Sequence, residues 1–162
     1  MNNDMKNPTK KSIKRLSIAT LIIGGLTLAY FYWEMIAQLW VSSYIYPITW
    51  NPDLKGWQIF ILIARFVGLT ALYILCWIFL YRTNRGLEDG EIFPKSNIPI
   101  IRWGALVAAL LAFVNSNYAA AVKGESEFAL DSNFILVPLI VLLFAGLYKM
   151  AYLAAKDSKL AI

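Results

Sequence analysis

YRTNRGLEDGEIFPKSNIPIIRW, residues 81–103, is the longest break between the apolar runs of this 162-residue chain. It carries basic and acidic side chains in close succession, namely Arg82, Arg85, Lys95, Arg102, Glu88, Asp89 and Glu91. Charged side chains are costly in hydrocarbon, so this stretch does not cross a bilayer. Because two long apolar segments precede it and two follow it, we interpret residues 82–102 as a hub between two membrane hairpins.

The apolar segments are long enough to span a membrane. They cover residues 16–40, 57–81, 103–122 and 134–155, and residues 16–40 alone would extend roughly 37 Å as a helix. The chain is 59% hydrophobic with a mean hydropathy of +0.58, which is atypical of a soluble domain. The first segment exceeds a signal-peptide core and lacks an obvious cleavage site, so we expect it to be retained. We predict an all-α fold, with residues 1–162 forming one integral membrane four-helix bundle.

Local signals predict where two of the helices begin. Ser96 or Asn97 can cap the third helix, with Pro99 in its first turn, where the missing N–H removes no hydrogen bond. Pro138 predicts either the start of the fourth helix or a kink in it. In the hub, Phe93 follows a glycine turn and precedes a proline. We expect its ring to fold back onto the inner ends of the second and third helices.

Basic residues are distributed unevenly among the polar segments. Five, beginning with Lys6, precede residue 16, four lie in the hub and two in the tail, whereas the two remaining connections hold one each. By the positive-inside rule, eleven against two predicts that both termini and the hub are cytoplasmic. This distribution also explains the net charge of +5 without a nucleic acid partner. The expected partners are the lipid bilayer and a cytosolic protein, and the sequence leaves the oligomeric state open.

The chain lacks the residue types on which most enzymes and metal sites depend. It has no histidine, the commonest general base and metal ligand. Its lone cysteine, Cys76, lies in an apolar run, where a small buried side chain is the simpler interpretation. The sequence has no phosphate-binding loop and no Ser/His or Cys/His pairing. It therefore predicts a protein that is not an enzyme, with no catalytic residue, cofactor or metal.

Three polar residues within the apolar segments are predicted to share one layer. Glu34 lies roughly 9 Å below the outer boundary at Trp40, and Arg65 roughly 12 Å below the same boundary at Trp57. Asn115, on the third segment, comes to a similar level if the hydrocarbon is about 30 Å thick. Each side chain would be costly in lipid, so we expect all three to face the bundle or a wet cavity.

This layer has three possible interpretations. Glu34, Arg65 and Asn115 could form a small outward-facing site for a solute or ion. They could instead be a buried ion pair and an interhelical hydrogen bond that hold the bundle together. Arg65 could also extend toward the outer headgroups and need no partner. A structural role is the simplest interpretation, and a functional site is the alternative.

The hub resembles a bacterial membrane family described as domain of unknown function 2975. The resemblance rests on an arginine, a Gly-x-x-Phe turn and an Asn-x-x-x-x-Arg entry to a helix, here Arg85, Gly90, Phe93, Asn97 and Arg102. It extends to the four-span layout, but residues 156–159 read KDSK where the family more often has an acidic run. The resemblance implies a multi-pass protein of the bacterial cytoplasmic membrane, often encoded beside a small helix-turn-helix regulator.

Two functional hypotheses follow from these patterns. The first is a non-enzymatic signalling or regulatory membrane protein that acts through a cytosolic partner, such as a helix-turn-helix regulator, at the hub and the termini. The second is small-solute or ion binding or transport, or immunity to a membrane-active peptide, through the layer of Glu34, Arg65 and Asn115.

Overall fold

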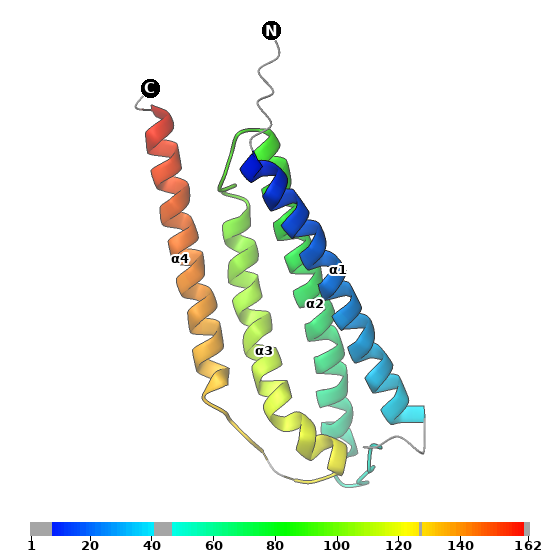
Figure 1. The fold of residues 1–162 in the computed structure, drawn as a ribbon. Coiled ribbons are helices and arrows are strands. Elements are labelled where there is room, and N and C mark those ends of the chain that lie inside the picture. The colour runs from blue at the N-terminus through cyan, green and yellow to red at the C-terminus, as the bar shows by residue number, and fades with distance from the viewer. Residues whose placement is uncertain (1–7, 41–46, 127, 161–162) are drawn as a thin grey trace.

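The computed structural model describes residues 8–40, 47–126 and 128–160, and it is all-helical over these ranges. Figure 1 shows four helices, α1 (Pro8–Trp40), α2 (Lys55–Glu88), α3 (Asn97–Lys123) and α4 (Asn133–Leu160). Each of them is long and apolar enough to cross a membrane. The all-α class and the number of long apolar helices are therefore confirmed. Lys6 of the basic arm lies outside the described residues.

The helices extend beyond the apolar runs that predicted them. α1 begins at Pro8, within the basic arm, and α2 continues past Tyr81 to Glu88, so the first part of the hub is helical. Arginine, leucine and glutamate all favour helix, and they make up much of this extension. The change from apolar to polar residues therefore does not mark the end of the helix. The connection between α2 and α3 is thus residues 89–96, shorter than the predicted hub.

The start of α3 matches the prediction in position but not in mechanism. Ser96 occupies the cap position and Pro99 lies in the first turn, but the Ser96 side chain makes no capping hydrogen bond. The backbone carbonyl of Ser96 instead accepts a hydrogen bond from Arg82 Nη1 at 2.8 Å. The two helix ends of the hub are therefore joined by a side chain of α2.

Pro138 was predicted to mark either the start of α4 or a kink in it, and the first of these is wrong. The helix begins at Asn133 and Pro138 lies inside it, so Pro138 does not mark its start. Asp131 favours the earlier start, because its backbone carbonyl accepts a hydrogen bond from Phe134 N at 2.9 Å. Hydrogen bonds from Ser132 and Asn133 also hold the pKa of the Asp131 carboxyl below its ordinary value.

The helices pack in the order of the sequence. α1 contacts α2, α2 contacts α3 and α3 contacts α4, and in the described part of the chain the backbones of α1 and α4 do not approach each other. Both termini and the α2–α3 connection lie at one end, which we call the hub end (Figure 1). The α1–α2 and α3–α4 connections lie at the other end, which we call the far end.

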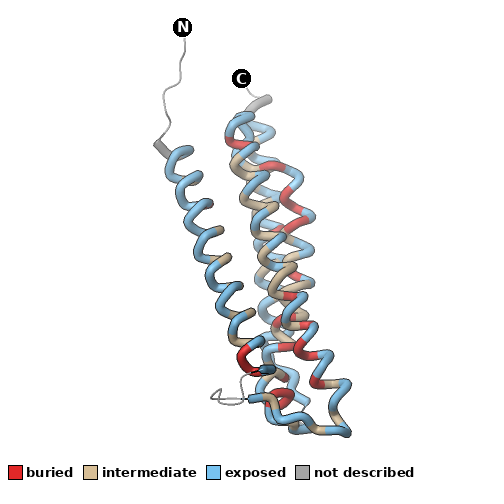
Figure 2. The backbone as a smooth tube through the Cα atoms, turned by 90° about the vertical axis from the view of Figure 1, so that its right-hand side faces the viewer, coloured by how far each residue is buried: buried red, intermediate tan, exposed pale blue. Residues whose placement is uncertain are grey.

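The apolar core is formed by the two central helices. Ile61 and Ala64 of α2 pack with Val114 and Ala121 of α3, and all four are buried. Figure 2 shows that α1, the helix nearest the N label, is exposed along most of its length. Its buried residues, among those described, are Ser17 near its start and Ala37 and Gln38 near its end. Its exposed residues include many large apolar side chains, as do those of α4. Such surfaces suit lipid contact better than contact with water.

Buried amides fasten the far-end connections to the central helices. Gln58, fully buried in the first turn of α2, donates to the carbonyls of Thr49 (2.8 Å) and Ala121 (2.7 Å). Its Oε1 accepts from the backbone N–H of Asn51 at 3.0 Å, and Asn51 Nδ2 donates to the Gly124 carbonyl at 3.0 Å. These bonds satisfy backbone groups that the end of α3 and the loop would otherwise leave unpaired.

Gly124 ends α3 in a conformation that favours glycine. Its φ is 72°, and a Cβ at this position would lie 2.7 Å from the Thr49 carbonyl oxygen. We predict that Gly124→Ala lowers the free energy of unfolding in detergent by about 1–2 kcal/mol from the left-handed backbone alone, with further loss from the contact. The matched control is Gly56→Ala, where a Cβ meets nothing within 4 Å. Equal unfolding midpoints for the two variants would contradict this account.

Candidate functional site

The structure brings Glu34 and Arg65 together between α1 and α2. Arg65 Nη2 lies 3.8 Å from Glu34 Oε2, and the two side chains are 11% and 23% exposed. This distance gives an ion pair but is too long for a hydrogen bond. Buried opposite charges of this kind stabilise each other because neither is well solvated.

Two aromatic rings enclose the guanidinium of Arg65. Its Cζ lies 3.7 Å from the centroid of the Tyr118 ring on α3 and 5.3 Å from that of Phe31 on α1. A guanidinium over an aromatic face is attracted by the negative charge of the ring face, and more strongly when water is excluded. Nε and Nη1 are buried and have no hydrogen-bond partner among the described residues. The cation is thus held by ring faces and one carboxylate, while part of its hydrogen-bonding capacity is unused.

Asn115 does not join this pair. Its side chain is exposed, and the structure shows no hydrogen bond between it and any described residue. The buried asparagine is Asn117, whose Nδ2 donates to the Ala129 carbonyl (2.8 Å) and whose Oδ1 accepts from Ala129 N (2.9 Å). The predicted level is consistent with the structure, since Tyr118, one turn from Asn115, contacts Arg65. The prediction that Asn115 faces the interior of the bundle is not consistent with its exposure. Successive residues of a helix differ in direction by about 100°, so Asn117 and Tyr118 can face inward while Asn115 does not.

Polar contacts also join the rest of α1 to its neighbours, and the sequence analysis did not identify them. Seven residues at alternate intervals of four and three form a buried or half-buried line, the α1 seam: Ser17, Leu21, Gly24, Leu28, Phe31, Met35 and Gln38. This spacing is that of a coiled-coil stripe, and it could have been found from the sequence. The polar members of the seam are Ser17 and Gln38.

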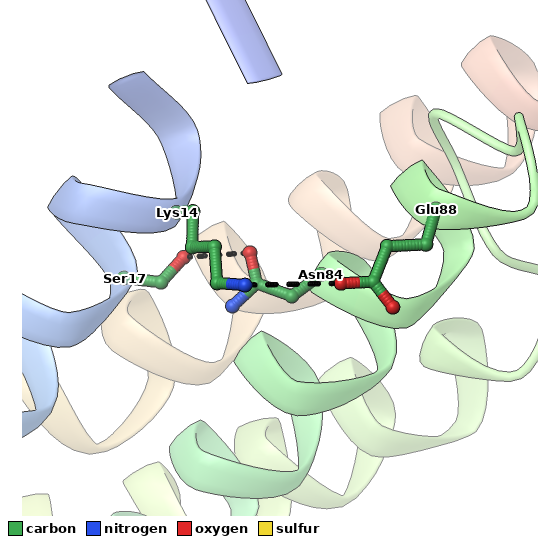
Figure 3. Close-up of polar contacts among 4 residues, drawn as sticks. All are labelled: Lys14, Ser17, Asn84 and Glu88. Carbon is green, nitrogen blue, oxygen red and sulfur yellow. Dashed lines mark hydrogen bonds and ion pairs between the residues drawn. The ribbon is translucent and has the colours of Figure 1, made fainter. Parts of the chain in front are cut away.

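Residues near both ends of the α1 seam make polar contacts with α2 or α3. The Ser17 hydroxyl, which donates to the Ile13 carbonyl at 2.9 Å, also lies 3.4 Å from Asn84 Oδ1, beside the exposed Lys14–Glu88 ion pair (Figure 3). Tyr73 donates to the Leu21 carbonyl at 3.4 Å, and Tyr118 donates to Gln38 Oε1. Next to the seam, hydroxyl groups of Tyr32 and Thr70 also bond to each other. Hydrogen bonds therefore join α1 to α2 and α3 at several positions along its length.

The five hub residues of the family resemblance have different environments. Arg85 and Arg102 are exposed, and Gly90 lies in the turn after α2 with a φ of 79°. Asn97 is fully buried, and its Nδ2 lies within hydrogen-bond distance of the Thr83 hydroxyl (2.9 Å) and the Tyr148 hydroxyl (3.2 Å). Asn97 is therefore a structural junction of α2, α3 and α4, and it is not an exposed contact residue.

Phe93 lines a pocket with Phe79 of α2 and Ile101 of α3, and it also contacts α4, which the prediction did not include. Its ring packs edge-to-face against Tyr148 of α4, with 5.5 Å between centroids. Tyr148 also packs against Phe79 of α2 at 5.9 Å. The sequence predicted a docked ring but could not show that α4 provides its contact, because the fourth segment lies far away along the chain.

A groove of about 290 Å³ lies between the hub turn and the end of α4. Its lining residues include Phe93, Tyr152 and Ala155 together with the charged Glu91 and Lys156. Ile92, which also lines the groove, is 59% exposed. Among the described residues, no three histidine, cysteine, aspartate or glutamate side chains gather where they could hold a metal ion.

No family model, curated protein or solved structure matches the chain. The resemblance of the hub to domain of unknown function 2975 therefore stays a prediction.

The pairing of Glu34 with Arg65 can be measured by a double-mutant cycle. We predict that Glu34→Gln and Arg65→Gln each lower the free energy of unfolding by about 3–5 kcal/mol, because each leaves one buried charge uncompensated. The double variant should recover much of this loss. The measurement is unfolding of the detergent-solubilised protein on titration with a denaturing detergent. Simple additivity of the two effects would mean that the ion pair contributes nothing.

Proposed function

We propose that this chain is a multi-pass protein of the bacterial cytoplasmic membrane with both termini and the hub in the cytoplasm. We infer a non-enzymatic regulatory role, in which a cytosolic protein such as a helix-turn-helix regulator binds at the hub end. The observation that carries this proposal is the exposed Ile92 beside the groove between the hub turn and α4.

The hub turn is held firmly enough to serve as a docking surface. Glu91 N donates to the Gly86 carbonyl at 2.6 Å, and a Cβ on Gly86 would lie 2.4 Å from Pro94 Cγ. Arg82 and Asn97 link the same turn to α2, α3 and α4. A surface that is already ordered loses little conformational entropy when a partner binds.

The groove has the chemistry of a small protein-binding site. Its aromatic and aliphatic lining could accept an apolar side chain of a partner, and the acidic Glu91 and basic Lys156, which also line it, could orient that partner. Binding energy in protein interfaces is concentrated in such apolar pockets with polar rims. Ile92 adds an exposed aliphatic side chain to the apolar lining of this groove, and a contiguous apolar surface of this kind can be buried by a partner.

A second candidate function is the binding of a small solute or ion at Glu34 and Arg65. It is favoured by two buried guanidinium nitrogens of Arg65, Nε and Nη1, that lack partners among the described residues. Unpaired donors of a charged group are costly, and an oxygen-bearing ligand or water would satisfy them. Because Asn115 is exposed, this candidate site consists of Glu34 and Arg65 with Tyr118.

The membrane orientation can be tested by labelling single cysteines in a Cys76→Ala background. We predict that a membrane-impermeant thiol reagent modifies Asp53→Cys, in the α1–α2 connection, on intact cells. Asp89→Cys and Asp157→Cys should react only after the membrane is opened, because the positive-inside rule places their segments in the cytoplasm. Labelling of position 89 or 157 from outside would overturn the proposed orientation.

The proposed partner site can be tested with a photo-crosslinking amino acid at position 92. Ile135, at the far end and 64% exposed against 59% for Ile92, provides the matched control position. We predict a cytosolic protein adduct from position 92 and none from position 135, with the adduct reduced at least several-fold by Tyr152→Ala, which removes one wall of the groove. Absence of an adduct at 92, or one unaffected by Tyr152→Ala, would contradict the proposal.

A further inference from the structure

One face of α3 combines small residues with a polar one. Gly104, Ala108, Ala112, Asn115 and Ala119 follow one another at intervals of three and four, so they share one side of the helix. Asn115 and Ala119 are exposed and the other three are half-buried. We call this side the Asn115 face.

Asn115 leaves an amide without a partner at the level of the buried ion pair. Tyr118, one turn along α3, contacts Arg65. No hydrogen bond joins the Asn115 side chain to any residue that the structure describes. In the membrane protein proposed above, an amide at this depth faces lipid, which offers it neither a donor nor an acceptor. A polar group of a second molecule would supply the partner that the described residues do not provide.

Gly104 has no packing role within the described chain. A Cβ on Gly104 would meet nothing within 4 Å, whereas one on Gly68 would lie 2.8 Å from Leu111 Cδ2. Gly68 is explained by the close packing of α2 and α3. Glycine inside a helix is less favourable than alanine, so Gly104 has a cost that no internal contact offsets. A helix from another molecule that approaches the Asn115 face closely would explain it.

We propose that the Asn115 face is the contact surface for a second copy of this chain. A carboxamide has both a donor and an acceptor, so two Asn115 side chains related by a two-fold axis can bond reciprocally. Gly104, Ala108 and Ala112 form two successive small-x-x-x-small spacings, which let two helix backbones come close in a membrane. The partner helix is therefore α3 of the second copy.

This contact rests on the membrane insertion proposed above. The experiment distinguishes a failure of insertion from a failure of the contact. In native membranes, Ala119→Cys in a Cys76→Ala background keeps Asn115 and places a thiol one turn away on the same face. Oxidation should give a disulfide-linked dimer of this chain, and Leu106→Cys, 61% exposed on another side of α3, should give none. Extraction of the protein by alkaline carbonate would overturn membrane insertion, whereas an inserted protein without the dimer would overturn only the contact.

Two substitutions test which residues make the contact. Asn115→Leu should lower the cross-linked fraction about five- to tenfold, the expected loss for two interhelical hydrogen bonds. Gly104→Leu should abolish cross-linking without unfolding the monomer, since the monomer has space for the side chain. The controls are Ser116→Ala and Gly146→Leu, and neither should change the cross-linked fraction. Gly146 is a helical glycine of α4 where, as at Gly104, a Cβ would meet nothing within 4 Å. Cross-linking unaffected by both test substitutions, or a disulfide to a different protein, would overturn the proposal.

Discussion

The guanidinium of Arg65 is where three of the four helices meet. It extends from α2, pairs with Glu34 of α1 and lies against Tyr118 of α3. In hydrocarbon, two apolar helices gain little by leaving lipid for each other, so packing alone holds them weakly. In the membrane orientation proposed above, a charge that must be neutralised and enclosed supplies a stronger constraint, because separating the helices would expose it to lipid. The position of α1 depends on this constraint and on the α1 seam.

At both the far end and the hub end, buried polar side chains join neighbouring elements of the structure. At the far end, Gln58 and Asn117 bond the connections to the central helices, and both are fully buried. At the hub end, Asn97 joins α2, α3 and α4. Between these levels α2 and α3 pack mainly through apolar and small residues, such as Ala64 and Gly68 on α2, which allow close approach to α3. The apolar residues therefore determine how closely the helices pack, and the buried amides determine which elements are joined.

Part of the candidate site could be predicted from residue counting along the chain. Glu34 and Arg65 come to nearly the same depth when each is measured from its tryptophan boundary, and they are neighbours in the structure. The same arithmetic placed Asn115 at the right level but not on the right side, since level depends on rise and side depends on rotation. The rings around Arg65 and the contact of Phe93 with Tyr148 were not predictable by counting, because they join segments far apart in sequence.

By itself the sequence determined four long apolar helices, because an apolar run of sufficient length in lipid must satisfy its backbone hydrogen bonds internally. It also determined that most charged residues lie in the termini and connections, with Glu34, Arg65 and Lys149 as the charged residues inside the apolar segments. Only the tertiary structure decided that the helices pack in sequence order, that Asn117 is buried while Asn115 is exposed, and that α4 covers Phe93. The reason is that apolar surfaces are nearly interchangeable in hydrocarbon. Which face of each helix is buried therefore depends on shape and on a few polar contacts between distant segments.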